Sequence, residues 1–485
     1  HTRDRAEGRP YMTTLHPYNN GKHLLAVKGS PEEVLEMCTY QVRNGSRVRL
    51  TRKARQAILL ENERLAGDAL RVLGVAYREL DDDTMPKKTG QLVWLGLAGM
   101  ADPMRTGMDK LIAQFHRAGI ETVMITGDQS ATAQSIGQQL GLSQGKPLQV
   151  LESSQLENLD PELLAGLVKN VHVFARVSPA HKLKIVQAFQ QAGKVVAMTG
   201  DGINDGPALK AADIGVAMGS GGTDVAREVS DVVLEDDNLH TMSVAVNQGR
   251  TIYNNIRKMI HFMISTNLTE IEVMLAGLVF NIGQPMNSMQ LLWINLVTDI
   301  FPGLALSLEP AEPDIMERPP RDPDEAIIEG RDLKRMIFES GTIGLGTMGA
   351  YLYGLKRYGP GAAASTLAFN TLTLNELAHA YSSRSHYRNV FGGQHLQPNP
   401  HLTKAILGMG GLQALVSMLP ACRRLLGTTP MGPADLLVIA SGVLLPLIAN
   451  EFTKPVAPDR DIMLDDADWS AESLLDDDNE QEIVV

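Results

Sequence analysis

The stretch Met198-Thr-Gly-Asp-Gly-Ile-Asn-Asp-Gly-Pro207 decides how the rest of the chain is interpreted. It follows the apolar run at 195–197, and this pattern predicts a strand that ends in an acidic, glycine-rich loop. Two carboxylates of the loop, Asp201 and Asp205, are four residues apart. Carboxylate oxygens are the ligands that Mg²⁺ prefers. An ordinary surface turn uses the same residue types, so the loop alone leaves both interpretations open.

A second apolar run ends in the same way, in Thr126-Gly127-Asp128. From residue 92 onward, predicted strands alternate with predicted helices, which is typical of a parallel sheet covered by helices. In such sheets ligands bind at the carboxyl ends of the strands, where both Thr-Gly-Asp sequences lie. The predicted strands are 93–100, 122–128, 171–175, 195–199, 214–218 and 231–234, and the predicted helices are 108–118, 131–141 and 179–193.

These two strand ends and Lys182 make a phosphate site plausible on grounds of charge. The Thr126 hydroxyl could donate to a phosphoryl oxygen, Gly127 would let the backbone approach it, and Lys182 would supply a positive charge. Asp201 and Asp205 could hold Mg²⁺. Phosphoryl transfer mainly needs positioning and charge stabilisation, but we identify no nucleophile with a matching motif. Taken by itself, Lys182 would be interpreted as a solvated residue on a helix. Its position directly after Arg176-Val-Ser-Pro-Ala-His instead favours a functional role at the phosphate site.

Residues 1–85 predict a separate α+β domain. The runs Tyr11-Met-Thr-Thr-Leu-His and Leu24-Leu-Ala-Val-Lys28 are typical of strands. Ser30 as a cap, with Pro31 at the first helical position, predicts a helix directly after Gly29. A further helix is predicted at 53–67 and a strand at 70–77, before a linker that begins at Pro86.

The net charge of −12 reflects mainly the carboxyl-terminal tail. Residues 459–485 hold eleven Asp and Glu against one Arg, net −10, so the rest of the chain is nearly neutral. No basic nucleic-acid surface is indicated. The two cysteines, Cys38 and Cys422, indicate neither a disulfide framework nor a thiolate metal site. The polar start without Met predicts that the chain begins inside a longer protein.

Residues 249–455 contain apolar segments of roughly membrane-spanning length. An even number of crossings would return the tail to the side of the soluble head. Connections 309–335 and 384–404 carry five and three Lys or Arg, whereas the opposite face carries two basic pairs, which favours a cytoplasmic head and tail. The six predicted helices lie near 252–280, 289–308, 336–355, 363–381, 404–422 and 434–452.

Ionisable residues within these apolar segments are costly and therefore suggest function. Asn267 and Glu270 are three residues apart in the first predicted helix, and Asn295, Thr298 and Asp299 are grouped by helical spacing in the second. Pro302-Gly303 would interrupt backbone bonding and free carbonyl oxygens. Together these groups could ligate a hard cation. Interhelical packing would explain Asn267 or Thr298 taken singly, and Glu272 falls on another face of its helix.

Five short motifs, in their order along the chain, resemble those of the second half of a P-type cation-transporting ATPase. The motifs are Lys28-Gly-Ser-Pro-Glu, Asp102-Pro-Met-Arg, Met124-Ile-Thr-Gly-Asp, His181-Lys182 and Thr199-Gly-Asp-Gly-Ile-Asn-Asp205. The resemblance implies a phosphorylation domain of haloacid dehalogenase fold and a partial nucleotide-binding domain that binds ATP. It further implies that Lys28, Gly29 and Arg71 lie near the nucleotide, that Thr126, Gly127, Asp128, Lys182 and Asn204 surround an aspartyl phosphate, and that Asp201 and Asp205 hold Mg²⁺.

The same resemblance implies partners that this chain does not contain. The family's nucleophile lies in an Asp-Lys-Thr-Gly-Thr segment before the nucleotide domain, and the actuator domain and first four membrane helices are also missing. We therefore expect that the chain alone does not form the phosphoenzyme. Asn295-Leu-Val-Thr-Asp299, Ser265-Thr-Asn-Leu-Thr-Glu270 and the connection from Glu309 to Arg321 resemble calcium pumps of the sarcoplasmic reticulum type.

One departure from two-site calcium pumps lies in the fourth predicted helix. No glutamate aligns clearly in Ala380-Tyr-Ser-Ser-Arg-Ser, so a single ion site is possible. Asn375, Glu376 and His379 are polar alternatives there, with no geometric reason to choose among them. Six helices after the phosphorylation domain nevertheless suit the calcium-pump class and argue against heavy-metal pumps, which have two.

The leading hypothesis is the carboxyl-terminal part of an ATP-driven pump, with calcium as the cation, in a bacterial plasma membrane. Its predicted parts are a nucleotide-binding domain at 1–85, a phosphorylation domain at 86–248, six membrane helices at 249–455 and an acidic cytoplasmic tail at 456–485. Two alternatives remain: a non-catalytic membrane sensor or regulator, and a phosphatase of the dehalogenase superfamily. The residues do not decide calcium against manganese, sodium or protons.

Overall fold

The computed structural model describes residues 1–6, 9–18, 21–67, 70–86, 88–101, 104–156, 159–391 and 396–455. Asp102 and Pro103 of the Asp-Pro-Met-Arg motif and the acidic tail at 456–485 lie outside these residues. The chain divides into two compact units. One comprises His1–His116 with Glu121–Met242, and the other comprises Arg117–Ile120 with the chain from Ser243 onward.

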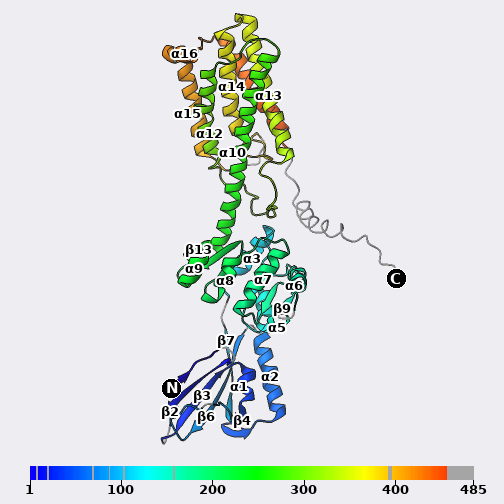
Figure 1. Ribbon diagram of the computed structural model, residues 1–485, viewed down its shortest axis with the longest axis vertical. Coiled ribbons are helices and arrows are strands. Elements are labelled where there is room, and N and C mark those ends of the chain that lie inside the picture. The colour runs from blue at the N-terminus through cyan, green and yellow to red at the C-terminus, as the bar shows by residue number, and fades with distance from the viewer. Residues whose placement is uncertain are drawn as a thin grey trace, which may run out of the picture. The chain divides into compact units, whose positions relative to one another are not determined.

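The first unit begins with a seven-stranded sheet in the order β1-β2-β3-β6-β7-β4-β5. One face is apolar and packs against α1 (Pro31–Glu36) and α2 (Arg52–Gly67), because Leu25, Val27 and Ala76 alternate with more exposed residues along their strands. The strands are β1 (Thr2–Arg3), β2 (Tyr11–Pro17), β3 (His23–Gly29), β4 (Cys38–Arg43), β5 (Ser46–Arg49), β6 (Leu70–Leu80) and β7 (Leu92–Ala101) (Figure 1).

Strand β7 corrects one prediction. The alternation of strands and helices from residue 92 places it in the parallel sheet, but β7 pairs antiparallel with β6, from Leu70 opposite Ala101 to Tyr77 opposite Val93, and parallel with β4. Both edges of β7 therefore form their backbone hydrogen bonds within the seven-stranded sheet. An antiparallel return after β6 gives partners to the backbone groups of Leu70–Tyr77 on that edge of β6, which explains this arrangement.

The rest of the first unit has two parallel three-stranded sheets, β8-β10-β9 and β11-β12-β13, instead of the single predicted sheet. Within the described residues no ladder joins β8 to β11. Strand β9 was not predicted from the sequence. The strands are β8 (Met124–Ile125), β9 (Val150–Glu152), β10 (Val173–Ala175), β11 (Ala197–Gly200), β12 (Ile214–Met218) and β13 (Val232–Leu234).

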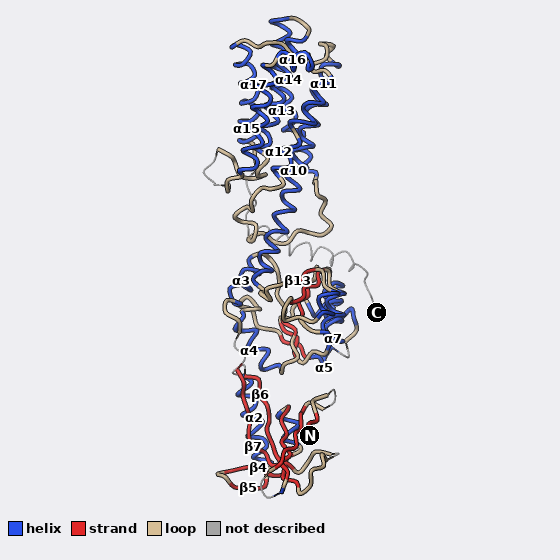
Figure 2. The backbone as a smooth tube through the Cα atoms, turned by 90° about the vertical axis from the view of Figure 1, so that its left-hand side faces the viewer, coloured by secondary structure: helices blue, strands red, loops and turns tan. Residues whose placement is uncertain are grey.

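Short helices pack on these sheets and form their cores. Ile185 and Val186 of one helix are fully buried, each in a different core cluster, so this helix contacts both sheets' interiors. The helices are α3 (Met108–Arg117), α4 (Ser130–Leu140), α5 (Ser153–Leu156), α6 (Pro161–Val168), α7 (Pro179–Gln191), α8 (Gly206–Ala211) and α9 (Asp224–Val229) (Figure 2).

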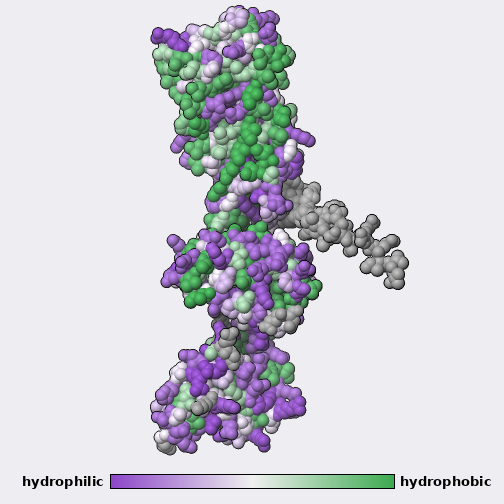
Figure 3. Space-filling model, in the orientation of Figure 1, coloured by the Kyte–Doolittle hydropathy of each residue, from purple (hydrophilic) through white to green (hydrophobic). Residues whose placement is uncertain are grey.

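The second unit is helical. Hydrophobic side chains gather on the outside of its helices (Figure 3), and Leu278, Leu345 and Leu437 are each more than two thirds exposed. Apolar surface of this kind suits a lipid environment. The helices are α10 (His240–Val279), α11 (Ser288–Trp293), α12 (Ile300–Leu306), α13 (Gly330–Tyr358), α14 (Ala362–Ser382), α15 (Pro400–Met418), α16 (Pro420–Leu426) and α17 (Pro433–Phe452).

Three helical segments among the described residues are long and apolar enough to cross a membrane: α10, Ser288–Leu306 and α17. The pair α15 and α16 would make a fourth if it forms one span. The two helices meet at a bend of 93°, where one continuous helix was predicted, because Leu419 precedes Pro420 and takes an extended conformation. The count of six crossings stays a prediction.

Close contacts between small residues hold α13, α14 and α17 together. A Cβ on Gly346 would lie 2.3 Å from the carbonyl oxygen of Gly442, and a Cβ on Gly354 would lie 2.6 Å from the Cα of Ala364. Backbones can approach this closely only where side chains are small, which is the usual basis of helix packing in membranes. The bundle therefore keeps a fixed register in which polar side chains of different helices face one another.

Ion pairs attach the loop between α12 and α13 to α10. Lys258 Nζ lies 2.7 Å from Glu312 Oε1, and Arg318 donates to Glu312 Oε2 at 2.8 Å and to Asp314 Oδ2 at 2.7 Å. Burial raises the pKa of Glu312, but Lys258 and Arg318 outweigh that effect and hold its pKa below the usual value. A carboxylate with a lowered pKa stabilises the fold above its unfolded pKa, so this link weakens as the pH falls.

Candidate functional site

The acidic loop after β11 contains a close ion pair. Lys182, in the first turn of α7, places Nζ 2.5 Å from Asp205 Oδ1, and the Asp205 side chain is only 8 % exposed. Gly200 is required beside this carboxylate, because a Cβ there would lie 2.6 Å from the Asp205 Cβ. The structure thus brings together two of the predicted phosphate-site residues. Asp201 and Asn204 lie exposed in the same loop.

The second Thr-Gly-Asp sequence, which follows β8, is also held by contacts of its own side chains. The Thr126 hydroxyl donates to Asp128 Oδ2 at 2.9 Å and accepts from the Asp128 amide at 3.1 Å. The amide of Val177, just after β10, donates to the Thr126 carbonyl and holds the two strand ends together. Gly127 is exposed with only the Val177 carbonyl near its missing Cβ. No hydrogen bond between described residues joins this group to the Lys182–Asp205 pair.

Two predicted nucleotide residues lie on the open face of the seven-stranded sheet. Lys28 pairs in register with Val75, and Arg71 is four residues from Val75 on the same strand, so Lys28 and Arg71 face the same side. Both are exposed, opposite the face that α1 and α2 cover. They are roughly 13 Å apart along the strand, a distance that an extended ligand could span.

Gly29 has a structural reason to be glycine. A Cβ there would lie 2.4 Å from Tyr11 Cβ and 2.6 Å from the Pro10 carbonyl oxygen. We expect Gly29→Ala to lower the free energy of unfolding of the first unit by about 1–3 kcal/mol, as overpacking does. Gly96→Ala, in the same sheet with no atom within 4 Å of the added Cβ, is the control. Thermal unfolding of the purified chain measures both, and equal midpoints would contradict the prediction.

The helical unit holds three buried carboxylates in one place. Oxygens of Glu270 on α10, Asp299 before α12 and Glu376 on α14 all lie within 4.8 Å of one another. Glu376 is 1 % and Asp299 4 % exposed. In the described part of the chain, the carboxylate oxygens of Asp299 and Glu376 accept no hydrogen bond. Three like charges, two of them without a hydrogen bond, are unfavourable in a buried site unless a cation or protons neutralise them.

The backbone at this cluster departs from a regular helix. A π-helical turn, Ile294–Thr298, separates α11 from α12, and the Asp299 amide donates to the Ile294 carbonyl five residues earlier. Such turns are frequent at functional sites. The predicted interruption at Pro302-Gly303 is therefore wrong, because both residues lie inside α12 and the irregular turn comes before Asp299.

The predicted amide and hydroxyl ligands, Asn295, Thr298 and Asn267, have different hydrogen-bond partners, and only Asn295 contacts a carboxylate of the cluster. The Asn295 amide donates to both oxygens of Glu270, at 2.8 and 2.7 Å, and so belongs to the cluster. The Thr298 hydroxyl is buried and donates to the Ile294 carbonyl. Asn267 is exposed and donates to the Met263 carbonyl of its own helix, so the structure does not bring it to Glu270. Its predicted role as a ligand stays a prediction.

Glu376 was one of three alternatives that the sequence left open on α14. Asn375 instead donates to the Gly442 carbonyl on α17, and His379 lies near Glu339. Glu272, which helical spacing places on another face of α10, accepts a hydrogen bond from Ser340 at 3.0 Å. The one signal in the sequence that points to Glu376 is that a carboxylate within an apolar segment is costly.

The two units together define a membrane protein with an α/β head and a helical domain that contains buried carboxylates. Comparison with known proteins agrees. Residues 5–107 match the family model described as "P-type ATPase, cytoplasmic domain N", and residues 283–456 match "Cation transporting ATPase, C-terminus". The first match includes β7, in agreement with its place in the seven-stranded sheet.

Similar curated proteins cover nearly the whole chain. A "Calcium-transporting ATPase" of Bacillus subtilis is 38% identical over 444 residues, 90% of this chain and 49% of the relative. "Calcium-transporting ATPase 1" of Bacillus cereus is 35% identical over 464 residues, which are 92% of this chain and 52% of the relative. The human "Calcium-transporting ATPase type 2C member 1" is 34% identical over 450 residues, which are 93% of this chain and 48% of the relative.

The chain belongs to the P-type cation-transporting ATPase family. It spans about half the length of the curated relatives it matches.

Proposed function

We propose that the chain is the carboxyl-terminal part of an ATP-driven pump that transports a cation, calcium, across a membrane. The observation that carries the proposal is the cluster of Glu270, Asp299 and Glu376, whose carboxylate oxygens lie within 4.8 Å of one another. Calcium takes several oxygen ligands and favours carboxylates, and a divalent charge would offset the repulsion among three of them. The names of the relatives support calcium over the other hard cations.

The proposed cycle makes and hydrolyses an aspartyl phosphate beside the loop after β11. Lys182 would lie next to the phosphoryl group, held in place by Asp205. Asp201 and the second oxygen of Asp205 would hold Mg²⁺, which offsets phosphate charge when bound. Thr126 and Gly127 would contribute a hydroxyl and close backbone approach, and Asn204 a further polar contact. Lys28 and Arg71 would bind ATP on the open face of the first sheet, and Gly29, whose Cβ position faces the buried side, would contribute only its backbone.

The sheet edges support the expected partner, an amino-terminal half that carries an Asp-Lys-Thr-Gly-Thr segment. Strands β8 and β11 each lie at the end of a three-stranded parallel sheet, and each is followed by Asp at its carboxyl end. Ile125 packs against the core clusters of both sheets, so the two edges are neighbours. One further parallel strand bonded to both would complete a haloacid dehalogenase-like sheet and end beside Thr126 and Lys182.

We propose further that α13 and α14 also cross the membrane, which makes six crossings with α10, Ser288–Leu306, α15–α16 and α17. They pack closely against α17 and contribute residues that are buried along most of α14. Head and tail would then lie in the cytoplasm, as the distribution of Lys and Arg favours. The membrane would be the bacterial plasma membrane, in keeping with the Bacillus relatives.

The test is to co-express the chain with an amino-terminal half that carries the Asp-Lys-Thr-Gly-Thr segment and to purify the pair. We expect ATP hydrolysis that Ca²⁺ stimulates, and accumulation of Ca²⁺ in vesicles that contain the pair. Neither half alone should do this, because nucleophile and cation ligands lie on different chains. A stable pair whose ATP hydrolysis is the same with and without Ca²⁺ would contradict the proposal and favour a sensor or a phosphatase.

A further inference from the structure

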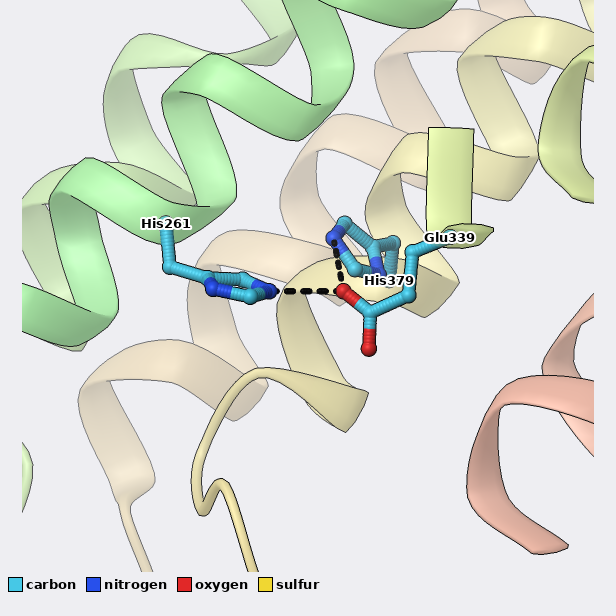
Figure 4. Close-up of side chains that lie close together, drawn as sticks. All are labelled: His261, Glu339 and His379. Carbon is cyan, nitrogen blue, oxygen red and sulfur yellow. Dashed lines mark hydrogen bonds and ion pairs between the residues drawn. The ribbon is translucent and has the colours of Figure 1, made fainter. Parts of the chain in front are cut away.

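A second group of buried side chains lies in the helical unit, and its chemistry differs from that of the carboxylate cluster. His261 on α10, Glu339 on α13 and His379 on α14 converge from three helices (Figure 4). One ligand atom of each lies within 4.8 Å of the others, and each residue is only 4 % exposed. His261 Nε2 lies 2.6 Å and His379 Nε2 lies 3.8 Å from Glu339 Oε2.

The histidine nitrogens of this cluster are poorly satisfied. In the described residues, neither ring nitrogen of His379 makes a hydrogen bond, and His261 Nδ1 makes none. A buried polar atom without a partner is unfavourable and calls for an explanation such as a bound ion, so this buried imidazole is a candidate ligand. The His379 ring is stacked on Phe262 with 6.0 Å between centroids, which restricts the plane of the ring.

Glu339 is held so that one oxygen faces the imidazoles. Arg335 Nε donates to Glu339 Oε1 at 2.6 Å, and Arg335 itself donates to the carbonyl oxygens of Thr453 and Asn450. The other oxygen, Oε2, is directed at both histidines (Figure 4). Hydrogen bonds that orient a ligating carboxylate in this way are typical of metal sites in proteins.

Two imidazole nitrogens and one carboxylate oxygen select a particular class of ion. Zn²⁺ binds such sets with bonds of about 2.0–2.2 Å, and a tetrahedral site then has its ligands about 3.3 Å apart. The 2.6 and 3.8 Å separations found here differ from that value by less than about 1 Å, which side-chain rotation can absorb. Calcium, by contrast, takes six or more oxygens, which this cluster does not offer.

We propose that His261, Glu339 and His379 bind a transition-metal dication of the zinc type, at a site separate from the calcium cluster. Both sites draw on α10 and α14, where His379 is one helical turn from Glu376. The two differ in ligand chemistry, since one offers oxygen alone and the other nitrogen and oxygen. The zinc-type site needs neither ATP nor the phosphorylation loop, so its test stands apart from the test of the pump.

The experiment titrates the full purified chain in detergent with Co²⁺, whose visible absorption reports coordination. We expect one Co²⁺ per chain, bands of the intensity that four- or five-coordinate cobalt gives, and their loss on addition of Zn²⁺ but not of excess Ca²⁺. X-ray absorption of the Zn²⁺-loaded chain should show two imidazoles around the metal. A wild-type chain without such bands, or a zinc spectrum without histidine, would overturn the proposal without any variant.

Variants locate the site. His379→Ala and Glu339→Gln should each weaken Co²⁺ binding by at least about 10- to 100-fold, the loss that follows even from removing a hydrogen-bond partner of a ligand. His401→Ala, which removes an exposed histidine at the start of α15, should leave it unchanged. Each variant is compared only if it elutes as the wild type does on size exclusion. Unchanged affinity and spectrum in folded His379→Ala would show that the metal binds elsewhere.

Discussion

Asp299→Asn is expected to raise the Ca²⁺ concentration for half-maximal ATP hydrolysis by the assembled pump at least about tenfold, because calcium affinity follows the number of charged ligands. Asp299 sits where the π-helical turn ends, is 4 % exposed and has neither carboxylate oxygen in a hydrogen bond within the described residues. The substitution keeps the shape of the side chain and removes one of three converging charges. The measurement is hydrolysis as a function of free Ca²⁺.

A second readout separates a ligand from a structural residue. Two unit charges 4 Å apart repel by about 4 kcal/mol at an effective dielectric constant of about 20, so the calcium-free cluster either takes up protons or remains strained. Asp299→Asn should therefore leave the thermal midpoint of the calcium-free chain unchanged or raise it, while calcium binding falls. A structural carboxylate would give a lower midpoint, because its partners would lose a hydrogen bond.

The matched control is Glu272→Gln. Glu272 lies two residues from Glu270 on α10 and accepts from Ser340, away from the cluster. It should leave the calcium dependence of hydrolysis as in the wild type. If Asp299→Asn and Glu272→Gln change that dependence equally, the assignment of Glu270, Asp299 and Glu376 as the cation site is wrong.

Lys182→Met is expected to abolish phosphoenzyme formation from labelled ATP in the assembled pump, because Lys182 is the cation beside the acidic loop. It should also destabilise the first unit. Breaking a buried ion pair costs about 3–5 kcal/mol, and we expect about 1–3 kcal/mol because the Lys182 side chain is 20% exposed. Lys184→Met, two residues along the same helix and exposed, should change neither quantity.

The double variant Lys182→Met with Asp205→Asn distinguishes the two effects. Removing both charges relieves the unpaired carboxylate, so the midpoint of unfolding should return most of the way to that of the wild type. Phosphoenzyme should remain absent, because the positive charge is still missing. Phosphoenzyme at the wild-type level in the stable double variant would show that the pair is only structural.

Local pattern predicted most elements of the first unit but not how they assemble. The run from Leu92 has the apolar character of a strand in either sheet, and only the ladder with β6 and β4 places it. The two short parallel sheets illustrate the same limit. A strand pattern specifies which groups need partners, whereas the partner is set by residues far away in the chain.

In the membrane unit, helical spacing was limited in the same way, because it does not show which side chains of different helices meet. It grouped Glu270 with Asn267, yet three residues correspond to about 300° of rotation, and Asn267 is exposed while Glu270 is buried. Spacing within one helix also could not choose among Asn375, Glu376 and His379. The packing of α14 against its neighbours directs Glu376 to the carboxylates and His379 to Glu339.

By itself the sequence determined the order of soluble and membrane parts, the acidic loop from Thr199 to Pro207, and the carboxylates in apolar segments, because composition and periodicity are local properties. Only the tertiary structure decided that Lys182 pairs with Asp205, that Glu376 completes the cluster with Glu270 and Asp299, and that two histidines meet Glu339. Each of these joins side chains from different elements, and their distances depend on packing between helices and strands that no local pattern records.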